Sequence, residues 1–421
     1  MVNFSLFRND PFNKLLSKLG LLNQKGKPRV VWVILLEILI AWAIPALLAM
    51  AQRVSVNFFS PADAYLFDFA AIGQFIIVVP ILIAAEPYVD EEIEWDINHL
   101  FLSNLINKES CEKFKKIIAS AEKAQAWKGI FILILVLSFG FGLSYGIGEF
   151  TNCSDNWHAL VANLDKCQAP KWESPTWAGW WNTIFSQAIL IFVHLRWFWK
   201  VIVWYTVLWK LSRMRLHLHA THPDQFGGLG FLANIQSRFS LLILAVGLDI
   251  AITDSYKIFI ESKSGAVMTL TFTSISGIGA IAYVVFAPLL FLIPLLFFWG
   301  SLSETKRQSI LRYSSLAMKY SNKIESLLQG TENKISKVEI LNADPEKFPV
   351  LISIDVVDSR EIKEAMEHLG ALREYYATIQ KMHTLPLDFQ KTRQLFISAI
   401  SPIIPLVIQY VLTNLFTPGK T

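Results

Sequence analysis

Long apolar runs alternate with short charged segments along this chain. A helix that crosses a bilayer needs about 20 apolar residues, and seven runs come close to this length or exceed it: Val30–Met50, Asp68–Ala85, Gly129–Gly146, Thr183–Trp209, Phe239–Ile260, Ala266–Gly300 and Leu395–Leu415. The runs lack the period-2 alternation that is typical of an outer-membrane β-barrel. The pattern therefore predicts an all-α membrane protein with about seven transmembrane helices and long helical cytoplasmic extensions.

The sixth run is longer than a single crossing requires. It predicts either a helix that projects beyond the bilayer or a re-entrant turn at residues 276–279 (SGIG). Near the N-terminus, no apolar core precedes residue 30, so the first run is expected to act as the insertion signal as well.

Lysine and arginine are distributed unevenly among the segments that separate the runs. They are frequent in residues 1–29, after the second run and after the fourth run, and sparse in the other loops, a bias that marks the cytoplasmic side. The N-terminus is therefore predicted to be cytoplasmic and the C-terminus periplasmic. Composition agrees with a membrane protein, since 53% of the 421 residues are hydrophobic and 17% are charged. The net charge of +4 reflects the loop bias and does not indicate nucleic-acid binding.

These runs divide the chain into four parts: a cytoplasmic N-terminal segment (1–29), a transmembrane bundle with spans 1–6 (30–300), a cytoplasmic helical segment (301–393), and the last span with a short outer tail (394–421). Within the bundle, the cytoplasmic loop 86–128 begins acidic and is predicted to continue as an amphipathic helix over about 108–127. The outer loop 149–182 is rich in tryptophan.

The cytoplasmic segment 301–393 is predicted to hold two helices. The first should stop at Gly330, because glycine commonly ends helices, and the second should run from Ser359 to about Lys381. Between them, the β-branched run VLISIDVV is a candidate strand. Asp388 is expected to cap the helix that leads into the last span.

Two of the three cysteines, Cys153 and Cys167, fall in the predicted outer loop. An oxidising compartment permits a disulfide there, whereas Cys111 falls on the predicted cytoplasmic side. The sequence therefore predicts a disulfide between Cys153 and Cys167.

A charged, glycine-rich stretch, THPDQFGGLGFL (221–232), separates the fourth and fifth runs. The residues that suit a sharp turn are His222, Pro223, Asp224, Gly227, Gly228 and Gly230. The proline disfavours helical geometry in the residue before it, so the fourth helix should end near Ala220. The glycines permit a tight reversal before a helix restarts near Phe231. We favour this structural interpretation.

Other interpretations of the same stretch are weaker on chemical grounds. His-Pro-Asp is also the loop signature of J-domain co-chaperones, but both flanks here enter the membrane, which excludes that fold. Glycines before a helix can bind phosphate, yet GGLG is neither a Walker loop nor a dinucleotide fingerprint. His217, His219 and His222 are candidate metal ligands with Asp224, but residues 217 and 219 would point to nearly opposite sides of a helix. No cofactor is predicted.

Two regions resemble a group of uncharacterised bacterial multi-pass inner-membrane proteins. Residues 195–232 carry an Arg-Trp-x-Trp-basic span (RWFWK) and the loop HPDQFGGLG, and residues 382–409 carry a Pro-x-Asp turn before the last span, in MHTLPLDFQKTRQLF, followed by IIPLVI. In the second region, His-Thr-Leu at 383–385 stands where the group has a more basic turn. The resemblance implies a bacterial inner-membrane location and no particular activity.

Several ionisable side chains fall inside the apolar runs, where a charge is costly and normally faces a partner or a cavity. They are Glu37, His194, Arg196, Lys200, Asp249 and Asp254. Arg196 and Asp249 lie at the centres of their runs, which predicts that they pair directly or across one water. Lys200, four residues from Arg196 on the same helix face, lies at about the depth of Glu37, which predicts a second pair. The sequence leaves open whether these groups hold helices together or line a polar path.

Three functions compete on this basis. Buried charges and prolines in spans 1, 6 and 7 favour an ion channel or small-solute transporter, and the seven-span topology parallels that of insect chemoreceptor channels. A membrane-embedded enzyme using His222 and Asp224 is disfavoured, because no nucleophile elbow, zinc-protease motif or carboxylate pair beside a histidine is present. The third is a signalling or scaffold protein that acts through its cytoplasmic helices. The expected surroundings are the lipid bilayer, and a homo-oligomer is compatible with the sequence.

Overall fold

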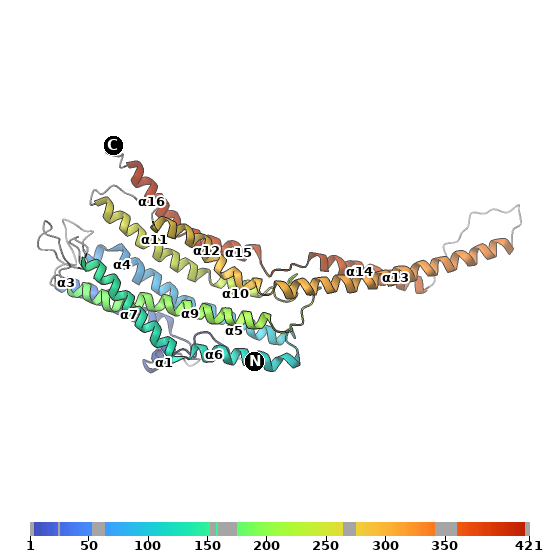
Figure 1. The fold of residues 1–421 in the computed structure, drawn as a ribbon, viewed down its shortest axis with the longest axis horizontal. Helices are drawn as coiled ribbons and strands as arrows, with labels where there is room; N and C mark the ends of the chain where they lie inside the picture. The colour runs from blue at the N-terminus through green and yellow to red at the C-terminus, as the bar shows by residue number, and fades with distance from the viewer. Residues whose placement is uncertain are drawn as a thin grey trace. The chain divides into compact units, whose positions relative to one another are not determined.

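The computed structural model describes residues 4–23, 26–52, 64–151, 157–158, 175–263, 275–341 and 360–416. Two compact units form within the chain. Unit 1 falls within residues 1–216, 232–297 and 387–421, and unit 2 within residues 217–231 and 298–386. Throughout the described ranges the chain forms helices and turns and no β-strand (Figure 1).

Seven helices of the described chain are long and apolar enough to cross a membrane. They are Val30–Ala51, Phe69–Leu102, Ser110–Gly148, Trp177–Ser212, Leu232–Phe259, Ile278–Leu296 and Phe389–Gln409, numbered spans 1 to 7. Each overlaps one of the predicted apolar runs. The predicted fold class, an all-α protein with seven membrane-spanning helices, is confirmed.

Unit 1 contains all seven spans and a short N-terminal helix. Its α-helices are α1 (Pro11–Lys18), α2 (Val30–Ile38), α3 (Ile44–Ala51), α4 (Phe69–Ile72), α5 (Val79–Leu102), α6 (Lys108–Gln125), α7 (Lys128–Thr151), α8 (Trp177–Trp181), α9 (Gln187–Ser212), α10 (Leu232–Arg238), α11 (Ser240–Lys263), α12 (Ile275–Leu296), α15 (Phe389–Ile400) and α16 (Ile403–Phe416). A 3₁₀ turn, Tyr65–Phe67, precedes α4.

Three spans widen locally into π-helical segments: Leu39–Ala43 in span 1, Gly73–Val78 in span 2 and Asn182–Ser186 in span 4. A proline closely follows each of the first two segments, at Pro45 and Pro80. Because proline has no N–H and its ring crowds the preceding turn, the regular hydrogen-bond pattern is interrupted there. The segment in span 1 contacts the other two, so the three irregular segments meet inside the bundle.

Spans 2, 4 and 5 form the interior of unit 1. In the most apolar stretch of each of them, 56% of the residues are buried, against 22–28% in the other four spans. The outer spans expose large apolar side chains such as Val31, Val136 and Phe286, as expected of surfaces that face lipid tails. The ionisable groups at membrane depth therefore lie mainly on the helices that have the least lipid contact.

Helix α7 approaches the start of span 4 closely at two glycines. A Cβ at Gly142 would lie 3.1 Å from the carbonyl oxygen of Thr183 and 3.2 Å from the backbone nitrogen of Ala188, and a Cβ at Gly146 would overlap the Thr183 side chain. The spacing of four residues is the small-residue pattern by which membrane helices bring their backbones together. A larger side chain at Gly142 would separate the two helices.

The N-terminal residues 4–23 are an integral part of unit 1. Phe4 and Leu6 are fully buried, and the side chain of Asp10 caps the first helix, which has a proline at its first position. The sequence placed residues 1–29 outside the bundle, and the described part of that segment packs into it instead.

Span 2 extends well beyond its predicted run. Helix α5 continues to Leu102, so residues 86–102, predicted to begin a loop, are helical. Val89, Ile93 and Ile97 are buried and repeat every four residues, so the helix keeps one face inside the unit. The amphipathic helix predicted after it is confirmed as α6.

Two of three predicted boundaries in unit 1 differ in the structure, and one agrees. Helix α9 ends at Ser212 rather than near Ala220, because the chain is already extended at Leu216, which forms an isolated antiparallel bridge with Ile106. Helix α12 begins at Ile275 and continues through residues 276–279. This segment is therefore helical, and the alternative prediction of a re-entrant turn there is wrong. The predicted cap is confirmed, since Asp388 accepts hydrogen bonds from the first turn of α15.

Unit 2 contains two long helices that pack against each other, α13 (Trp299–Leu341) and α14 (Arg360–Lys381). Helix α13 passes through Gly330, where the sequence predicted its end. A glycine inside a helix costs about 1 kcal/mol relative to alanine but keeps the backbone hydrogen bonds. The bounds of α14 agree with the second predicted helix, and the candidate strand VLISIDVV lies outside the described residues.

Candidate functional site

The guanidinium group of Arg196 lies in the interior of unit 1 between two carboxylates. Its Nε is 2.6 Å from Oδ2 of Asp10, and its Nη1 contacts Oε1 of Glu86. Asp10 comes from the start of α1, Glu86 from α5 and Arg196 from α9, so these ion pairs join three segments of the chain. The three side chains are only 3–7% exposed. Because arginine keeps its proton at any ordinary pH, a buried arginine requires such partners.

A second cation, Lys200, lies one turn further along α9. Its Nζ is 3.1 Å from the same Oδ2 of Asp10, and its side chain is 1% exposed. We call Asp10, Glu86, Arg196 and Lys200 the ion cluster. Its two cations and two carboxylates have a formal charge of zero, which lowers the cost of burying them. Among the described residues, Nη2 of Arg196 lacks a hydrogen-bond partner, and the contact with Asp10 occupies at most one of the three N–H donors on Nζ of Lys200. The cluster therefore keeps unused donors.

Aromatic rings surround the two cations of the ion cluster. The Cζ atom of Arg196 lies 4.7 Å from the ring centre of Phe12 and 5.3 Å from that of Phe7. Nζ of Lys200 lies 5.5 Å from the ring centre of Phe7, which itself packs edge-on against Trp197. Cations are attracted to aromatic ring faces, so the N-terminal segment supplies both a counter-charge and an apolar cover.

Asp10 connects the ion cluster to the first helix. Its carboxylate accepts a hydrogen bond from the backbone N–H of Phe12 at 3.2 Å, and it is also the acid shared by Arg196 and Lys200. Burial alone would raise the pKa of Asp10, but the positive charges of Arg196 and Lys200 and the Arg196 hydrogen bond outweigh burial and hold the pKa below its usual value. Asp10 is therefore ionised at neutral pH.

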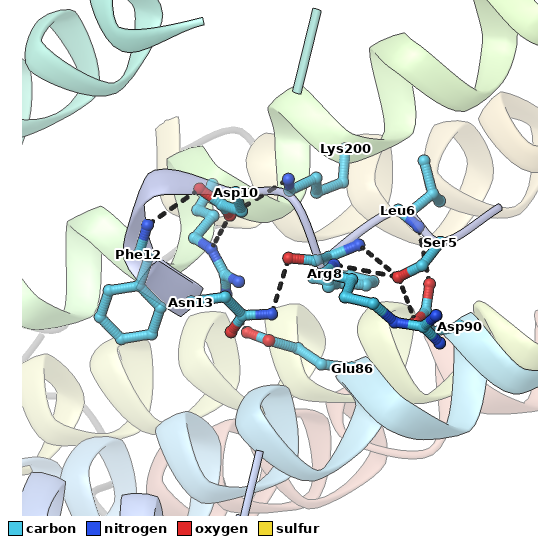
Figure 2. Close-up of polar contacts among 11 residues, drawn as sticks. Ser5, Leu6, Arg8, Asp10, Phe12, Asn13, Glu86, Asp90 and Lys200 are labelled. Atoms are coloured by element: carbon cyan, nitrogen blue, oxygen red, sulfur yellow. Dashed lines mark hydrogen bonds and ion pairs between the residues drawn. The ribbon is translucent and has the colours of Figure 1, made fainter. Parts of the chain in front are cut away.

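A second set of hydrogen bonds holds the N-terminal segment beside the ion cluster (Figure 2). Asp90, on the same helix as Glu86, accepts from the Ser5 hydroxyl at 2.6 Å and from the Leu6 backbone N–H at 2.7 Å. The amide of Gln125, turned to donate, lies 2.8 Å and 3.0 Å from the carbonyl oxygens of Ser5 and Leu6. The segment is thus anchored on α5 and α6 without a covalent link.

Three further ion pairs follow along α5, and all are partly exposed. They are Arg8–Glu94 at 3.4 Å, Lys27–Glu91 at 2.7 Å and Arg238–Glu92 at 2.8 Å. Pairs with this exposure stabilise a fold only modestly. Beyond them lies Asp96, which is 1% exposed and whose two carboxylate oxygens lack hydrogen-bond partners within the described part of the chain.

The predicted pairing of Arg196 with Asp249 is wrong. Asp249 instead accepts a hydrogen bond from Nε2 of Gln74 at 3.0 Å and lies 3.7 Å from Nε2 of His194. Successive residues of a helix turn by about 100°, so residues 194 and 196 point to different sides of α9, and Asp249 lies on the side of His194. Matching depth is therefore not enough to identify a partner.

The predicted pairing of Glu37 with Lys200 is also wrong, because Lys200 contacts Asp10. Glu37 is buried, and neither of its carboxylate oxygens has a hydrogen-bond partner among the described residues. Asp254, the last of the predicted intramembrane charges, lies 3.7 Å from Lys257 on its own helix.

The glycine-rich turn, in unit 2, is organised by Asp224. Its carboxylate accepts hydrogen bonds from the backbone N–H groups of Phe226 at 2.9 Å, Gly228 at 3.1 Å and Gly230 at 2.9 Å. Partial burial raises the pKa of Asp224, but these three hydrogen bonds and a 2.8 Å contact with His222 lower it more, so the pKa lies below its usual value. The carboxylate therefore acts as the fixed centre of the turn.

The glycines of this turn serve backbone geometry, as the structural interpretation predicted. Gly227 and Gly228 have φ angles of +65° and +96°, which side chains disfavour. Gly230 serves a different purpose, because a Cβ there would lie 3.1 Å from Oδ2 of Asp224.

The remaining candidate residues do not form a site in the described structure. No group of three or more His, Cys, Asp or Glu side chains is placed to hold a metal ion among the residues described, so His217, His219 and His222 do not form a ligand set. Cys153 and Cys167 lie outside the described residues, and their disulfide stays a prediction.

No protein-family model, no curated protein and no solved structure matches this chain. The class of the protein is defined by its own fold and site. It is a multi-pass, all-α membrane protein with a buried ion cluster in the interior of its helix bundle.

Proposed function

We propose that this protein moves an ion or a small solute across a bacterial inner membrane, as a gated channel or a transporter. The observation that supports the proposal most is a succession of polar groups along the interior spans. It begins with Gln74, His194 and Asp249, continues through the ion cluster, and ends with Asp90 and Asp96. Ionisable groups in a membrane interior are costly and typically mark substrate or ion paths.

The irregular helices of the bundle also favour a protein that changes conformation. Gln74, which binds Asp249, belongs to the π-helical segment of span 2, and that segment contacts the π-helical segment of span 1. Such segments occur frequently at functional sites. Interrupted helices near the centre of the membrane are also a common feature of transporters.

The ion cluster obstructs this path in the present conformation. Its charges neutralise one another, and Phe7 and Phe12 of the N-terminal segment lie against the two cations. Passage of a solute would therefore require the N-terminal segment to move. This requirement favours a gated channel or a transporter over a permanently open pore.

The proposed orientation has the N-terminus in the cytoplasm and the C-terminus in the periplasm, on the basis of the lysine and arginine bias. Reporter fusions test it. Fusions after Lys108 and Lys319 should be active only as cytoplasmic reporters, and a fusion after Asn163 only as a periplasmic reporter. The inverted pattern would contradict the orientation.

Flux into liposomes tests the proposed transport. Wild-type protein in liposomes should carry a current or take up at least one small ion or solute above the level of protein-free vesicles. Asp249→Asn should lower that flux at least tenfold, because it removes the charge beside His194 with little change in shape. Asp388→Asn is the matched control, since asparagine caps a helix as well as aspartate does. Equal flux in the two variants, or none above the protein-free level in the wild type, would contradict the proposal.

A second candidate function, binding of a protein partner through unit 2, is favoured by a groove between α13 and α14. The groove has a volume of about 1310 Å³, and its lining includes Met318 and Met366, which are 66% and 60% exposed. Methionine-rich surfaces adapt to varied partners. Photo-crosslinkers at Met318 and Met366 should then give a discrete adduct in intact cells, whereas one at Glu304 should not. The absence of an adduct would remove this candidate.

A further inference from the structure

The ion cluster contains one carboxylate that comes from outside the membrane spans. Glu86, Arg196 and Lys200 belong to spans 2 and 4, whereas Asp10 belongs to the N-terminal segment. One oxygen of Asp10, Oδ2, receives both cations, with Nε of Arg196 at 2.6 Å and Nζ of Lys200 at 3.1 Å. Charge-assisted hydrogen bonds from arginine and lysine to a carboxylate are strong, and the same two cations are suited to receive the carboxylate of a free anion.

Charge counting shows what the spans would hold without Asp10. Arg196 and Lys200 contribute +2 and Glu86 contributes −1, which leaves a net charge of +1 in a buried place. A group with a single negative charge restores neutrality, whereas a cation would increase the imbalance. Nη2 of Arg196, on a side chain that is 3% exposed, has no hydrogen-bond partner among the described residues, and Nζ of Lys200 has three N–H donors but contacts Asp10 alone among the carboxylates. The cations can therefore donate more hydrogen bonds than Asp10 accepts.

We propose that Arg196 and Lys200 form a binding site for a small monocarboxylate anion, and that Asp10 occupies this site as an internal competitor. The inference rests on the proposed transport function and names its substrate class. Displacement needs no covalent change, because the N-terminal segment is held by hydrogen bonds to Asp90 and Gln125, by the Arg8–Glu94 ion pair and by apolar packing. When the segment withdraws, Phe7 and Phe12 leave with Asp10, and the anion enters the vacated place.

Two substitutions of Asp10 separate this site from a merely structural ion pair. Asp10→Ser keeps a helix-capping hydroxyl but removes the charge and opens space beside Arg196 and Lys200. Asp10→Asn also keeps the cap and removes the charge, but it fills that space. Formate and acetate are the probes, compared with chloride at equal ionic strength, and the thermal midpoint of the full-length protein in detergent is the readout.

Formate and acetate should raise the thermal midpoint of Asp10→Ser in a saturable manner. The same salts should leave the wild type and Asp10→Asn unchanged, and adding Arg196→Leu to Asp10→Ser should abolish the response. A saturable response that is equal in Asp10→Ser and Asp10→Asn, an equal effect of chloride, or no response in Asp10→Ser would overturn the proposal.

A second measurement keeps the proposal testable if Asp10→Ser does not fold. Leu6→Cys, in a chain without the three native cysteines, places a thiol at a fully buried position of the N-terminal segment. With Ser5→Ala to weaken the anchor on Asp90, acetate should raise the labelling rate of this thiol several-fold and chloride should not. An unchanged rate would overturn the displacement.

The outcome is independent of the transport assay. If Asp10→Ser binds acetate but wild-type protein carries no flux, the transport function fails and the carboxylate site stands. If wild-type protein carries a flux and Asp10→Ser binds neither probe, the carboxylate site fails and transport stands.

Discussion

Removal of one charge from the ion cluster should destabilise the protein strongly, and removal of two opposite charges should not. In Arg196→Leu, Asp10 and Glu86 keep two negative charges against the single positive charge of Lys200, so the cluster has a net charge of −1. In Glu86→Leu, the two cations face Asp10 alone, with a net charge of +1. In the double variant, Asp10 and Lys200 remain 3.1 Å apart with no net charge.

The expected size of the effect follows from burial and distance. At about 3 Å and an effective dielectric constant of about 20, two unit charges interact by roughly 5 kcal/mol. Breaking a buried pair by removing one partner typically costs about 3–5 kcal/mol, and we expect each single variant to lose stability in this range. The unfolding free energy lost by the double variant should be smaller, by at least about 2 kcal/mol, than the sum of the losses of the two single variants. The reason is that residues in direct contact are energetically coupled.

Unfolding of the purified variants by sodium dodecyl sulfate in mixed micelles measures these differences. Arg307→Leu is a suitable control, because it removes an arginine from an ion pair that is largely exposed to solvent and should change stability little. The reasoning would be refuted if Arg196→Leu cost no more than Arg307→Leu. It would also be refuted if the losses of the two single variants simply added in the double variant.

Three further predictions concern other parts of the structure. The pKa of Asp10 is lower in the folded protein than in the unfolded chain, so ionised Asp10 stabilises the fold fully above the ordinary pKa of about 3.9. This stabilisation is lost as the pH falls toward the folded pKa. The unfolding free energy of Asp10→Asn should therefore fall less steeply than that of the wild type below about pH 4. Gly142→Leu should lower the unfolding free energy by about 1–3 kcal/mol through overpacking, whereas Gly140→Leu, where a Cβ meets nothing within 4 Å, should be neutral or stabilising. Asp224→Ala should lower the thermal midpoint more than His222→Ala does, because it removes three backbone hydrogen bonds, and the reverse order would contradict the role given to the carboxylate.

The parts of the fold that depend on local pattern could be predicted from the sequence. Apolar runs near bilayer length marked all seven spans. Each span must by itself contain about 20 apolar residues to cross the lipid, so this signal lies within one short stretch of sequence. The bounds of α14 and the cap at Asp388 were also predictable, since charged first turns and capping side chains act within a few residues. The turn at Gly227 followed for the same reason.

The partners in the ion cluster could not be predicted from local pattern. Glu86 and Asp10 lie 110 and 186 residues from Arg196 in sequence, and both lie outside the apolar runs. Within the runs, depth alone favoured Asp249 as the counter-ion. A signal was present near the N-terminus, where an aspartate and a proline begin a helix between apolar residues. It indicated a helix start but not that the helix enters a membrane-spanning unit.

Solute flux through the Arg196→Leu/Glu86→Leu double variant tests the central claim most directly. This variant keeps a neutral cluster and should remain folded, so any change in flux reports on function rather than on stability. The variant should be stable enough to be reconstituted in liposomes. If the buried charges belong to a transport path, its flux should fall to the level of protein-free vesicles. A folded double variant that carries the wild-type flux would contradict the claim and leave the ion cluster with a structural role alone.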